Sequence, residues 1–467
     1  MLKKNEIYRA AVTGFTSEGL GVCRVEGCAV FVPNAAPDEE YELRIVHVGK
    51  NAAHGRIEKI ITRSPHRVNR LCPYAKQCGG CDFWHLDYAA ECELKAQRVA
   101  DALNRLGGQQ LERVQITGAK TCEGYRNKAQ YPVAPGKNGP VAGFFKKGTH
   151  EVVEIERCRI QPACADAARA AVVEYLRKYK VSAYDEKTHT GLLRHIYVRH
   201  AEATGQVMVC LVVNAEKLPR EDALVSLLRA RVPGLKSVVL NVNTRPGNAI
   251  LGEKQRTLWG GDAIEDVLCG LTFRISPKSF YQVNRAQAEV LYGKALDAAG
   301  LTGQERVLDL YCGTGTITLC LAGRAKETIG VELVEAAIRD AEENARRNGI
   351  QNARFFCADA GQAAQKLCGV MEQHITQSAG KEADADATAK KALEDGKLLK
   401  TVTVNVLGDT GLLTGETVVV REAKTGLTGD FWIDADYHTW KNRNYYTKLT
   451  LNCRNVMATA NAGSEIA

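Results

Sequence analysis

Residues 307–333 read VLDLYCGTGTITLCLAGRAKETIGVEL, and this stretch decides the fold of its part of the chain. It predicts a short apolar strand, a glycine-rich turn, a helix and a second apolar strand that ends at Glu332. This order is typical of the first βαβ unit of a nucleotide-type cofactor site, in which Gly313 and Gly315 let the backbone pass close to the ligand. Glu332 stands where an acidic residue accepts hydrogen bonds from ribose hydroxyls.

The glycine turn differs from the dinucleotide-binding fingerprint in two respects. It lacks the third glycine, and it begins with Asp309 near the end of the first strand. These differences favour S-adenosylmethionine (SAM) over NAD as the ligand. Because turn glycines are common, the pattern taken alone fits an ordinary strand-to-helix turn as well.

Length and composition indicate a soluble protein of several domains. The chain has 467 residues, of which 45% are hydrophobic and 25% charged, so two to four domains are expected. No apolar run is long enough to cross a membrane, and the first residues, MLKKNEIYRA, do not read as a signal peptide, so we expect a cytoplasmic protein without a membrane partner. The formal charge of +8 favours polyanions only mildly, and simple solubility explains it as well.

Most of the 16 cysteines, among them Cys210, Cys269 and Cys320, lie in apolar runs, where cysteine acts as a small hydrophobic residue. The segment CPYAKQCGGC at 72–81 is different, because it places three cysteines at C-x5-C-x2-C among turn-forming residues, and Cys158 follows later in EIERCRIQ. Four converging thiolates suit an iron-sulfur cluster or zinc, and the spacing does not decide between them. The alternative is a set of unrelated loop thiols.

Four regions follow one another along the chain. Residues 1–60 alternate apolar and polar positions between turn glycines, the pattern of a small antiparallel barrel, and residues 61–275 contain the cysteine loop and a mixed α/β body. Residues 276–366 contain the glycine turn. Residues 371–467 begin with an alanine-rich segment that predicts a helix, AGKEADADATAKKALEDGK, and continue with antiparallel-type strands.

Taken in this order, residues 1–366 resemble the SAM-dependent RNA uracil-C5 methyltransferases of the RumA and TrmA family, and in particular the 23S ribosomal RNA branch. The resemblance rests on the cysteine motif, on SFYQVN at 279–284 and on DLYCGTGTITL at 309–319. It implies a multidomain fold with an OB-like TRAM barrel that binds RNA, a central α/β domain with a 4Fe-4S cluster, and a Rossmann-like SAM domain. It also implies a role in ribosomal RNA processing.

The resemblance assigns site residues one by one. It implies that the cluster ligands are Cys72, Cys78, Cys81 and Cys158. It implies that SAM is contacted by Gln282, Tyr311 and Glu332, with Thr316 and Asp359 as weaker assignments. Without the motif, Gln282 reads as a helix-start residue and Tyr311 as a core aromatic. The basic residues of GLLRHIYVRH, which are Arg194, His195 and Arg199, suit either RNA phosphate or the solvated face of an amphipathic strand.

The chemistry of this family requires two further groups. A cysteine thiolate adds to uracil C6, which makes C5 nucleophilic, and a general base later removes the C5 proton. In the family these groups lie in Ser-Cys-Asn-Pro-like and His-Val-Glu-like segments after an Asp-Pro-Pro-Arg-like loop. None of the three occurs in this chain, because the last proline is Pro277 and the cysteines after Cys357 are Cys368 and Cys453, neither in the expected setting. We therefore identify no catalytic residue and expect impaired activity.

The segment that replaces them, residues 371–467, resembles the end of the XkdQ/YqbQ group of phage tail baseplate hub proteins. The resemblance rests on the blocks LGDTGLLTGE and HTWKNRNYYTKL. It implies a β-rich domain used in assembly, with phage tail proteins as possible partners, joined near residue 367 to an incomplete SAM domain. Two other interpretations remain: a phage structural protein with an acquired N-terminal part, or a non-catalytic RNA-binding module.

Overall fold

The computed structural model describes residues 2–359 except Ser17, Arg70, Leu71 and Leu106, and then residues 402–407, 412, 417–422, 427–441 and 444–452. The chain divides into two compact units, Met1–Ala360 and Gly361–Ala467. The alanine-rich helix predicted after residue 371, the junction near residue 367, Cys368 and Cys453 lie outside the described residues. None of the described helices is both long enough and apolar enough to span a membrane.

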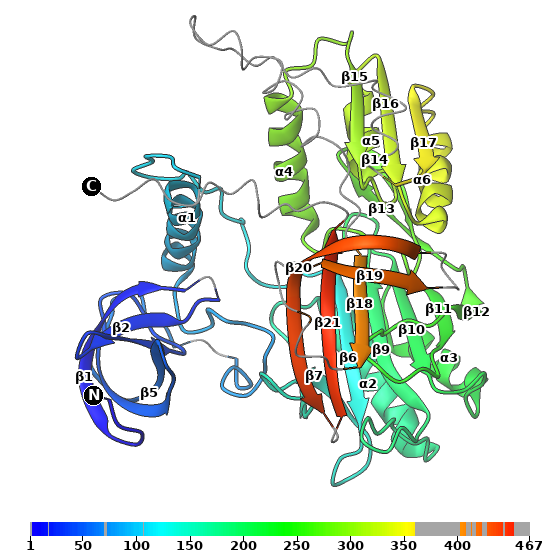
Figure 1. The fold of residues 1–467 in the computed structure, drawn as a ribbon. Coiled ribbons are helices and arrows are strands. Elements are labelled where there is room, and N and C mark those ends of the chain that lie inside the picture. The colour runs from blue at the N-terminus through cyan, green and yellow to red at the C-terminus, as the bar shows by residue number, and fades with distance from the viewer. Residues whose placement is uncertain are drawn as a thin grey trace, which may run out of the picture. The chain divides into compact units, whose positions relative to one another are not determined.

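The predicted N-terminal barrel is confirmed. Five strands close in the order β1-β2-β3-β5-β4, with β3 and β5 parallel and the other pairs antiparallel (Figure 1); they are β1 (Ile7–Phe15), β2 (Gly21–Val25), β3 (Cys28–Val32), β4 (Glu40–Val48) and β5 (Ala52–Thr62). Alternation decides which side chains face inward: along β4, Tyr41, Leu43 and Ile45 are fully buried.

A buried ion pair joins the barrel to the segment that follows it. Arg67 donates to both carboxylate oxygens of Glu39 at 2.6 Å, and the Tyr41 hydroxyl donates to Glu39 at 2.5 Å. Burial acts to raise the pKa of Glu39, but the donors Arg67, Tyr41 and the Ser64 amide outweigh it and hold that pKa below its usual range.

The middle of the chain forms a seven-stranded sheet in the order β12-β11-β10-β9-β6-β7-β8, in which β10 and β11 are parallel and the other neighbours antiparallel. Apolar residues of two helices and of the sheet share one large core. The elements, in chain order and starting with the helix that precedes the sheet, are α1 (Tyr88–Arg105), β6 (Lys128–Ala134), β7 (Val141–Phe145), β8 (Val152–Glu154), α2 (Ala163–Lys178), β9 (Leu193–His200), β10 (Val207–Val213), α3 (Glu221–Arg231), β11 (Leu235–Val242) and β12 (Lys254–Gly260).

The interpretation of GLLRHIYVRH as a strand with a solvated basic face is wrong. Its strand, β9, is central, and Arg194, His195 and Arg199 are only 4%, 8% and 3% exposed. Both sheet faces are covered at this strand: Ile196 packs in the large core, and Tyr197 packs with a second apolar cluster. Arg194 instead donates to the carbonyls of Asn243 and Arg245, both at 2.8 Å.

A two-stranded hairpin and a three-stranded parallel sheet follow. The hairpin pairs β13 (Ile264–Leu268) with β14 (Leu271–Ile275). The parallel sheet has the order β15-β16-β17. The strands of this sheet and the helices around them are, in chain order, α4 (Arg285–Ala298), β15 (Arg306–Leu310), α5 (Thr316–Ala322), β16 (Glu327–Glu332), α6 (Glu335–Arg347) and β17 (Ala353–Cys357).

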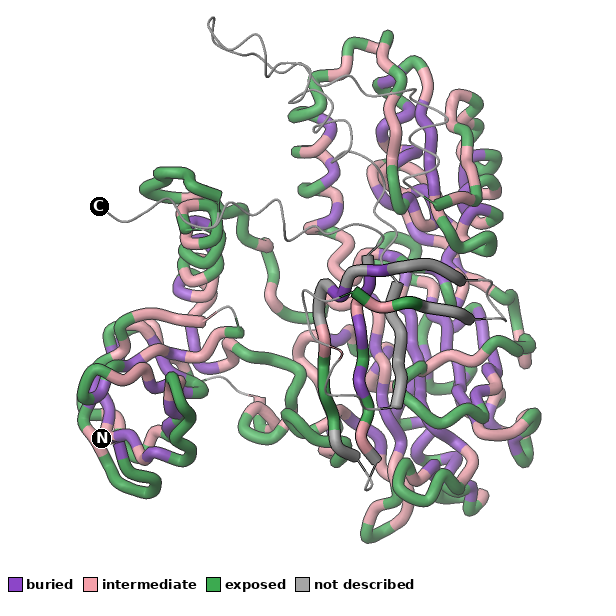
Figure 2. Tube along the Cα trace, viewed as in Figure 1, coloured by how far each residue is buried: buried purple, intermediate pink, exposed green. Residues whose placement is uncertain are grey.

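The first strand of the glycine-turn unit lies at an edge of its sheet. Among the described residues, β15 pairs only with β16, and no residue of β15 is fully buried, whereas four of the six residues of β16 are (Figure 2). A doubly wound sheet continues on both sides of this strand. The described part of the domain therefore supplies the strands on one side only.

The second unit contains an antiparallel sheet in the order β18-β21-β20-β19. Its strands are β18 (Val402–Leu407), β19 (Thr417–Glu422), β20 (Leu427–Lys441) and β21 (Asn444–Asn452). Phe431, Ile433, Leu449 and Leu451 form its small apolar core.

Candidate functional site

The glycine turn lies at the carboxyl end of β15. The backbone is left-handed at Tyr311 (φ 66°), Gly313 (φ 55°) and Gly315 (φ 77°). A Cβ atom on Gly315 would lie 2.9 Å from the Phe355 ring, so the turn packs closely against β17 and admits no side chain there. Tyr311 adopts a conformation that is unfavourable for a residue other than glycine, and it is 78% exposed, which contradicts its alternative reading as a core aromatic.

Acidic side chains hold this turn from two strands. The Glu332 carboxylate, at the end of β16, accepts hydrogen bonds from the Gly313 amide at 3.2 Å and the Val334 amide at 3.0 Å. Asp309 accepts a 2.5 Å hydrogen bond from the Thr318 hydroxyl on α5. Burial raises the pKa of Asp309, although the Thr318 hydrogen bond opposes the shift.

The segment SFYQVN lies beside the glycine turn. The Thr314 hydroxyl is 3.5 Å from the Phe280 carbonyl, and the Thr316 hydroxyl is 3.0 Å from that of Tyr292 on α4. Gln282 lies two residues before Asn284, and the side chain of Asn284 caps the N-terminus of α4. The chain thus brings Gln282's segment, Tyr311, Thr316 and Glu332 to one edge. Asp359 is exposed and follows β17, in which Cys357 is the register partner of Glu332.

Three residues that position SFYQVN were not identified as such from the sequence. The buried Arg199 guanidinium donates to the Ser279 carbonyl, and Asn127 donates from its side chain to the Gln282 carbonyl at 2.8 Å. Asp340 on α6 accepts a hydrogen bond from the Ser279 hydroxyl at 3.0 Å. The partners are far apart in the sequence, so no local pattern indicated these contacts.

Large exposed apolar side chains gather at the same edge. Phe280 is 67% exposed, Leu333 71% and Val334 57%. Exposed apolar surface beside a glycine turn and a carboxylate fits a ligand with a planar base and a ribose. The residues present therefore fit SAM.

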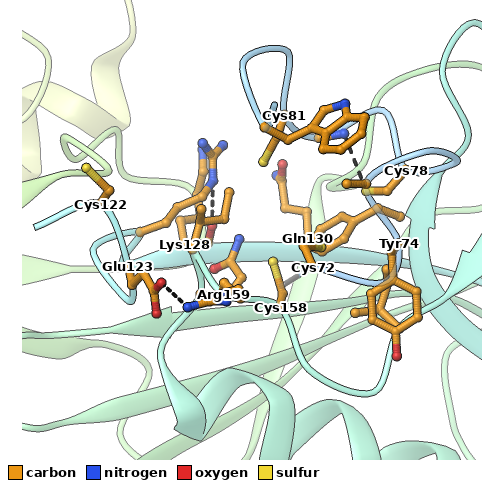
Figure 3. A pocket seen from close by; sticks show the side chains of 18 of the residues that line it. Cys72, Tyr74, Cys78, Cys81, Cys122, Glu123, Lys128, Gln130, Cys158 and Arg159 are labelled. Atoms are coloured by element: carbon orange, nitrogen blue, oxygen red, sulfur yellow. Dashed lines mark hydrogen bonds and ion pairs between the residues drawn. The ribbon is translucent and has the colours of Figure 1, made fainter. Parts of the chain in front are cut away.

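The predicted cluster cysteines line one cavity of about 510 Å³. Cys72, Cys78 and Cys81 come from the loop between β5 and α1, and Cys158 from the loop between β8 and α2; Cys122 lines the cavity too. In Figure 3 the sulfur atoms of Cys81 and Cys158 point into the space between these residues. The cysteine loop lies against β7, where Gly79 donates to the Phe145 carbonyl at 2.9 Å.

Four soft ligands in one cavity fit an iron-sulfur cluster in kind and number. Within the described residues, however, no three histidine, cysteine, aspartate or glutamate side chains are placed closely enough to hold a metal ion. The cavity is therefore lined by suitable side chains that are not arranged as a ligand shell.

Three known family profiles match successive parts of the chain. A TRAM domain profile matches residues 2–57, a methyltransferase domain profile matches residues 301–371, and a YQBQ-like profile matches residues 345–452. The last two matches overlap at residues 345–371.

Similar proteins cover most of the chain. An uncharacterized RNA methyltransferase of Halalkalibacterium halodurans is 41% identical over 360 residues, which are 77% of this chain and 79% of the relative. Another, of Caldanaerobacter subterraneus subsp. tengcongensis, is 42% identical over 366 residues, or 78% of this chain and 81% of the relative.

A solved structure has a similar fold. The Pyrococcus abyssi tRNA (uracil-54, C5)-methyltransferase, in complex with S-adenosyl-L-homocysteine, superposes with a TM-score of 0.61 at 22% identity, covering 95% of this chain and 99% of that chain. At this identity the likeness concerns the fold alone. With the identities above, the TRAM barrel and the SAM methyltransferase fold, the chain belongs to the RNA methyltransferase family and carries a YQBQ-like C-terminal segment.

Proposed function

We propose that this chain is derived from enzymes that use SAM to methylate C5 of a uridine in 23S-type ribosomal RNA, and that the chain itself is impaired in that reaction. One observation carries the proposal. The Glu332 carboxylate accepts a hydrogen bond from the glycine turn, and the segment SFYQVN contacts the same turn. The division into domains at 1–60, 61–275, 276–366 and 371–467 belongs to the same proposal.

In this proposal residues at the carboxyl edge of β15–β17 would hold SAM, which would supply an electrophilic methyl group. Glu332 would accept hydrogen bonds from the ribose, and the glycine turn would let the protein backbone pass close to the ligand. Gln282 and Tyr311 contact the same ligand, with Thr316 and Asp359 as weaker contacts. Arg199 and Asn127 act through SFYQVN, because they hold its carbonyl groups rather than the ligand.

We also assign a 4Fe-4S cluster to Cys72, Cys78, Cys81 and Cys158. The shared cavity supports the assignment, since the two loops that carry these cysteines are far apart in the sequence and yet line the same space. Cluster assembly would require these side chains to come closer together than they are in this structure. The cluster would tie the cysteine loop to the segment between β8 and α2.

The reaction fails in this chain, on our proposal, because two groups are missing. Uracil C5 becomes nucleophilic only after a thiolate adds to C6, and a base must then take the C5 proton. After Cys357 the chain offers only Cys368 and Cys453, and it has no proline after Pro277 to form the family's loops. Nucleoside mass spectrometry of ribosomal RNA after incubation with the chain and SAM tests this directly.

A second function, in phage tail assembly, is favoured by one observation, the YQBQ-like match at residues 345–452. If this unit assembles, the chain should co-purify with tail particles from a phage-producing culture. If the chain is absent from purified tails but binds SAM and RNA, only the enzyme-derived interpretation remains.

A further inference from the structure

One face of α6 lies against the outer edge of the β13–β14 hairpin. Within the described residues β14 pairs with β13 alone, so its other edge presents backbone groups to the helix. Two asparagines, one turn apart on the same helix face, bind these groups. Asn348 accepts from the Thr272 amide and donates to the Thr272 carbonyl, both at 2.8 Å. Asn344 accepts from the Arg274 amide at 2.9 Å, so helix side chains take the place of a third strand.

Asn344 also contacts the glycine turn. Its side-chain nitrogen donates to the Thr314 carbonyl at 3.1 Å, while its oxygen accepts from the Arg274 amide. Asn344 is fully buried and Thr314 is only 4% exposed, so water does not compete for these hydrogen bonds. One carboxamide thus joins the glycine turn, 30 residues earlier in the sequence, to β14, 70 residues earlier.

Asp340, one turn earlier on the same face of α6, binds the segment that follows β14. It accepts from the Arg274 guanidinium at 3.1 Å and from the Ser279 hydroxyl at 3.0 Å. Ser279 is the first residue of SFYQVN, and its hydroxyl is 2.8 Å from that of Ser276, the residue directly after β14. The chain from β14 into SFYQVN is therefore fastened to α6, and Asn344 fastens α6 to the glycine turn.

We propose that Asn344 is a positioning residue of the SAM site, because it holds together the two segments that carry the SAM contacts. The inference rests on the proposed function, in which Gln282 of SFYQVN and Tyr311 of the glycine turn contact one ligand. Since Asn344 is fully buried, it acts through these segments rather than on the ligand. Asn348 binds β14 in the same way, but the hydrogen bonds described for it do not reach the glycine turn. The two asparagines therefore differ in the contact that couples the segments.

Hydrogen exchange mass spectrometry of the full-length chain tests the coupling without any ligand. Asn344→Ala should speed exchange both in β14 and at the amides of residues 312–315, because it removes a hydrogen bond to each segment. Asn348→Ala is the matched control and should speed exchange in β14 alone. Wild-type protection of β16 shows that each variant is folded. The proposal is overturned if Asn344→Ala leaves residues 312–315 unchanged, or if both variants affect them equally.

Calorimetric titration with SAM tests the consequence. Loss of one buried hydrogen bond that holds the site in shape should raise the dissociation constant of Asn344→Ala roughly 3- to 10-fold, and that of Asn348→Ala less than about 2-fold. If Asn344→Ala does not fold, Asn344→Ser and Asn348→Ser replace the pair, because a serine hydroxyl is too short to reach both segments. Equal SAM affinities of the two variants would overturn the positioning role. Wild-type protein that binds no SAM would overturn the proposed SAM site and this role with it, whereas the exchange comparison separately decides whether Asn344 joins the two segments.

Discussion

Glu332 and Gly313 are joined by a hydrogen bond of 3.2 Å from the glycine amide to the carboxylate. The bond links the end of β16 to the turn after β15, so the acidic residue predicted to bind ribose also holds the loop that would admit the ligand. Its other oxygen accepts the Val334 amide at 3.0 Å and fixes the chain before α6. A substitution at Glu332 therefore changes both the contact surface and the shape of the turn.

For this reason Glu332→Ala should weaken SAM binding. A lost hydrogen bond to a charged group is worth about 1.5–3 kcal/mol, which corresponds to a dissociation constant roughly 10- to 150-fold higher. Isothermal titration calorimetry measures the dissociation constant of SAM for wild type and variant. Glu335→Ala is the control, because Glu335 lies at the exposed start of α6 and forms a surface ion pair with Arg339 on the same helix. Equal affinities of wild type and Glu332→Ala would remove Glu332 from the site.

Protein purified without oxygen should be brown and carry about four iron atoms per chain, as expected for a 4Fe-4S cluster. Cys78→Ser should remove most of the colour and destabilise the central domain, whereas Cys122→Ser should keep it, because Cys122 lines the cavity but is not an assigned ligand. Iron analysis and visible absorbance report both results. One zinc per chain with no visible absorbance would show that the iron assignment is incorrect.

Breaking the buried pair of Glu39 and Arg67 should destabilise the barrel, because the Glu39 carboxylate would stay buried without its cation. Removing one partner of a buried ion pair costs about 3–5 kcal/mol, so Arg67→Ala should lower the protection of β4 amides in hydrogen exchange mass spectrometry. Arg9→Ala is the matched control, since its ion pair with Glu40 is exposed to solvent and should contribute little to stability. Unchanged protection in Arg67→Ala would contradict the prediction.

The same pair gives the barrel a pH dependence. The pKa of Glu39 is lower in the folded chain than in the unfolded chain, so its contribution is fully present above the unfolded value of about 4.3. The contribution is lost as pH falls through the lower folded value. Barrel protection, corrected for intrinsic exchange rates, should therefore decline below about pH 4 in wild type and change less in Arg67→Ala.

We expect no 5-methyluridine from the chain as it stands, because it lacks the nucleophile and base of the family. Residues 1–366 joined to the C-terminal half of a family member should methylate ribosomal RNA, since that half restores the missing groups and the strands beyond β15. Mass spectrometry of digested RNA compares the two proteins. Formation of 5-methyluridine by the present chain, abolished by Cys453→Ala, would show that our interpretation of the C-terminus is wrong.

The sequence by itself determined the features that depend on neighbouring residues. Strict alternation predicted the barrel, and the run from Val307 to Leu333 predicted the strand, turn and helix around Gly313, because period and turn chemistry are local properties. The cysteine spacing likewise predicted ligands that do share a cavity. The assignments of individual residues to SAM and of a 4Fe-4S cluster to the cysteines came from resemblance and remain proposals.

Only the tertiary structure decided which faces are covered and which distant residues meet. The basic residues of β9 read as a solvated face, yet Arg199 is buried and holds Ser279, 80 residues away. Cys269 and Cys320 each read as a small hydrophobic residue in an apolar run, and both pack against one apolar cluster that residues of β13, β14, α4, α5 and α6 share. A local pattern fixes the direction of a side chain relative to its own strand or helix. What lies opposite depends on packing between elements, which a local pattern does not contain.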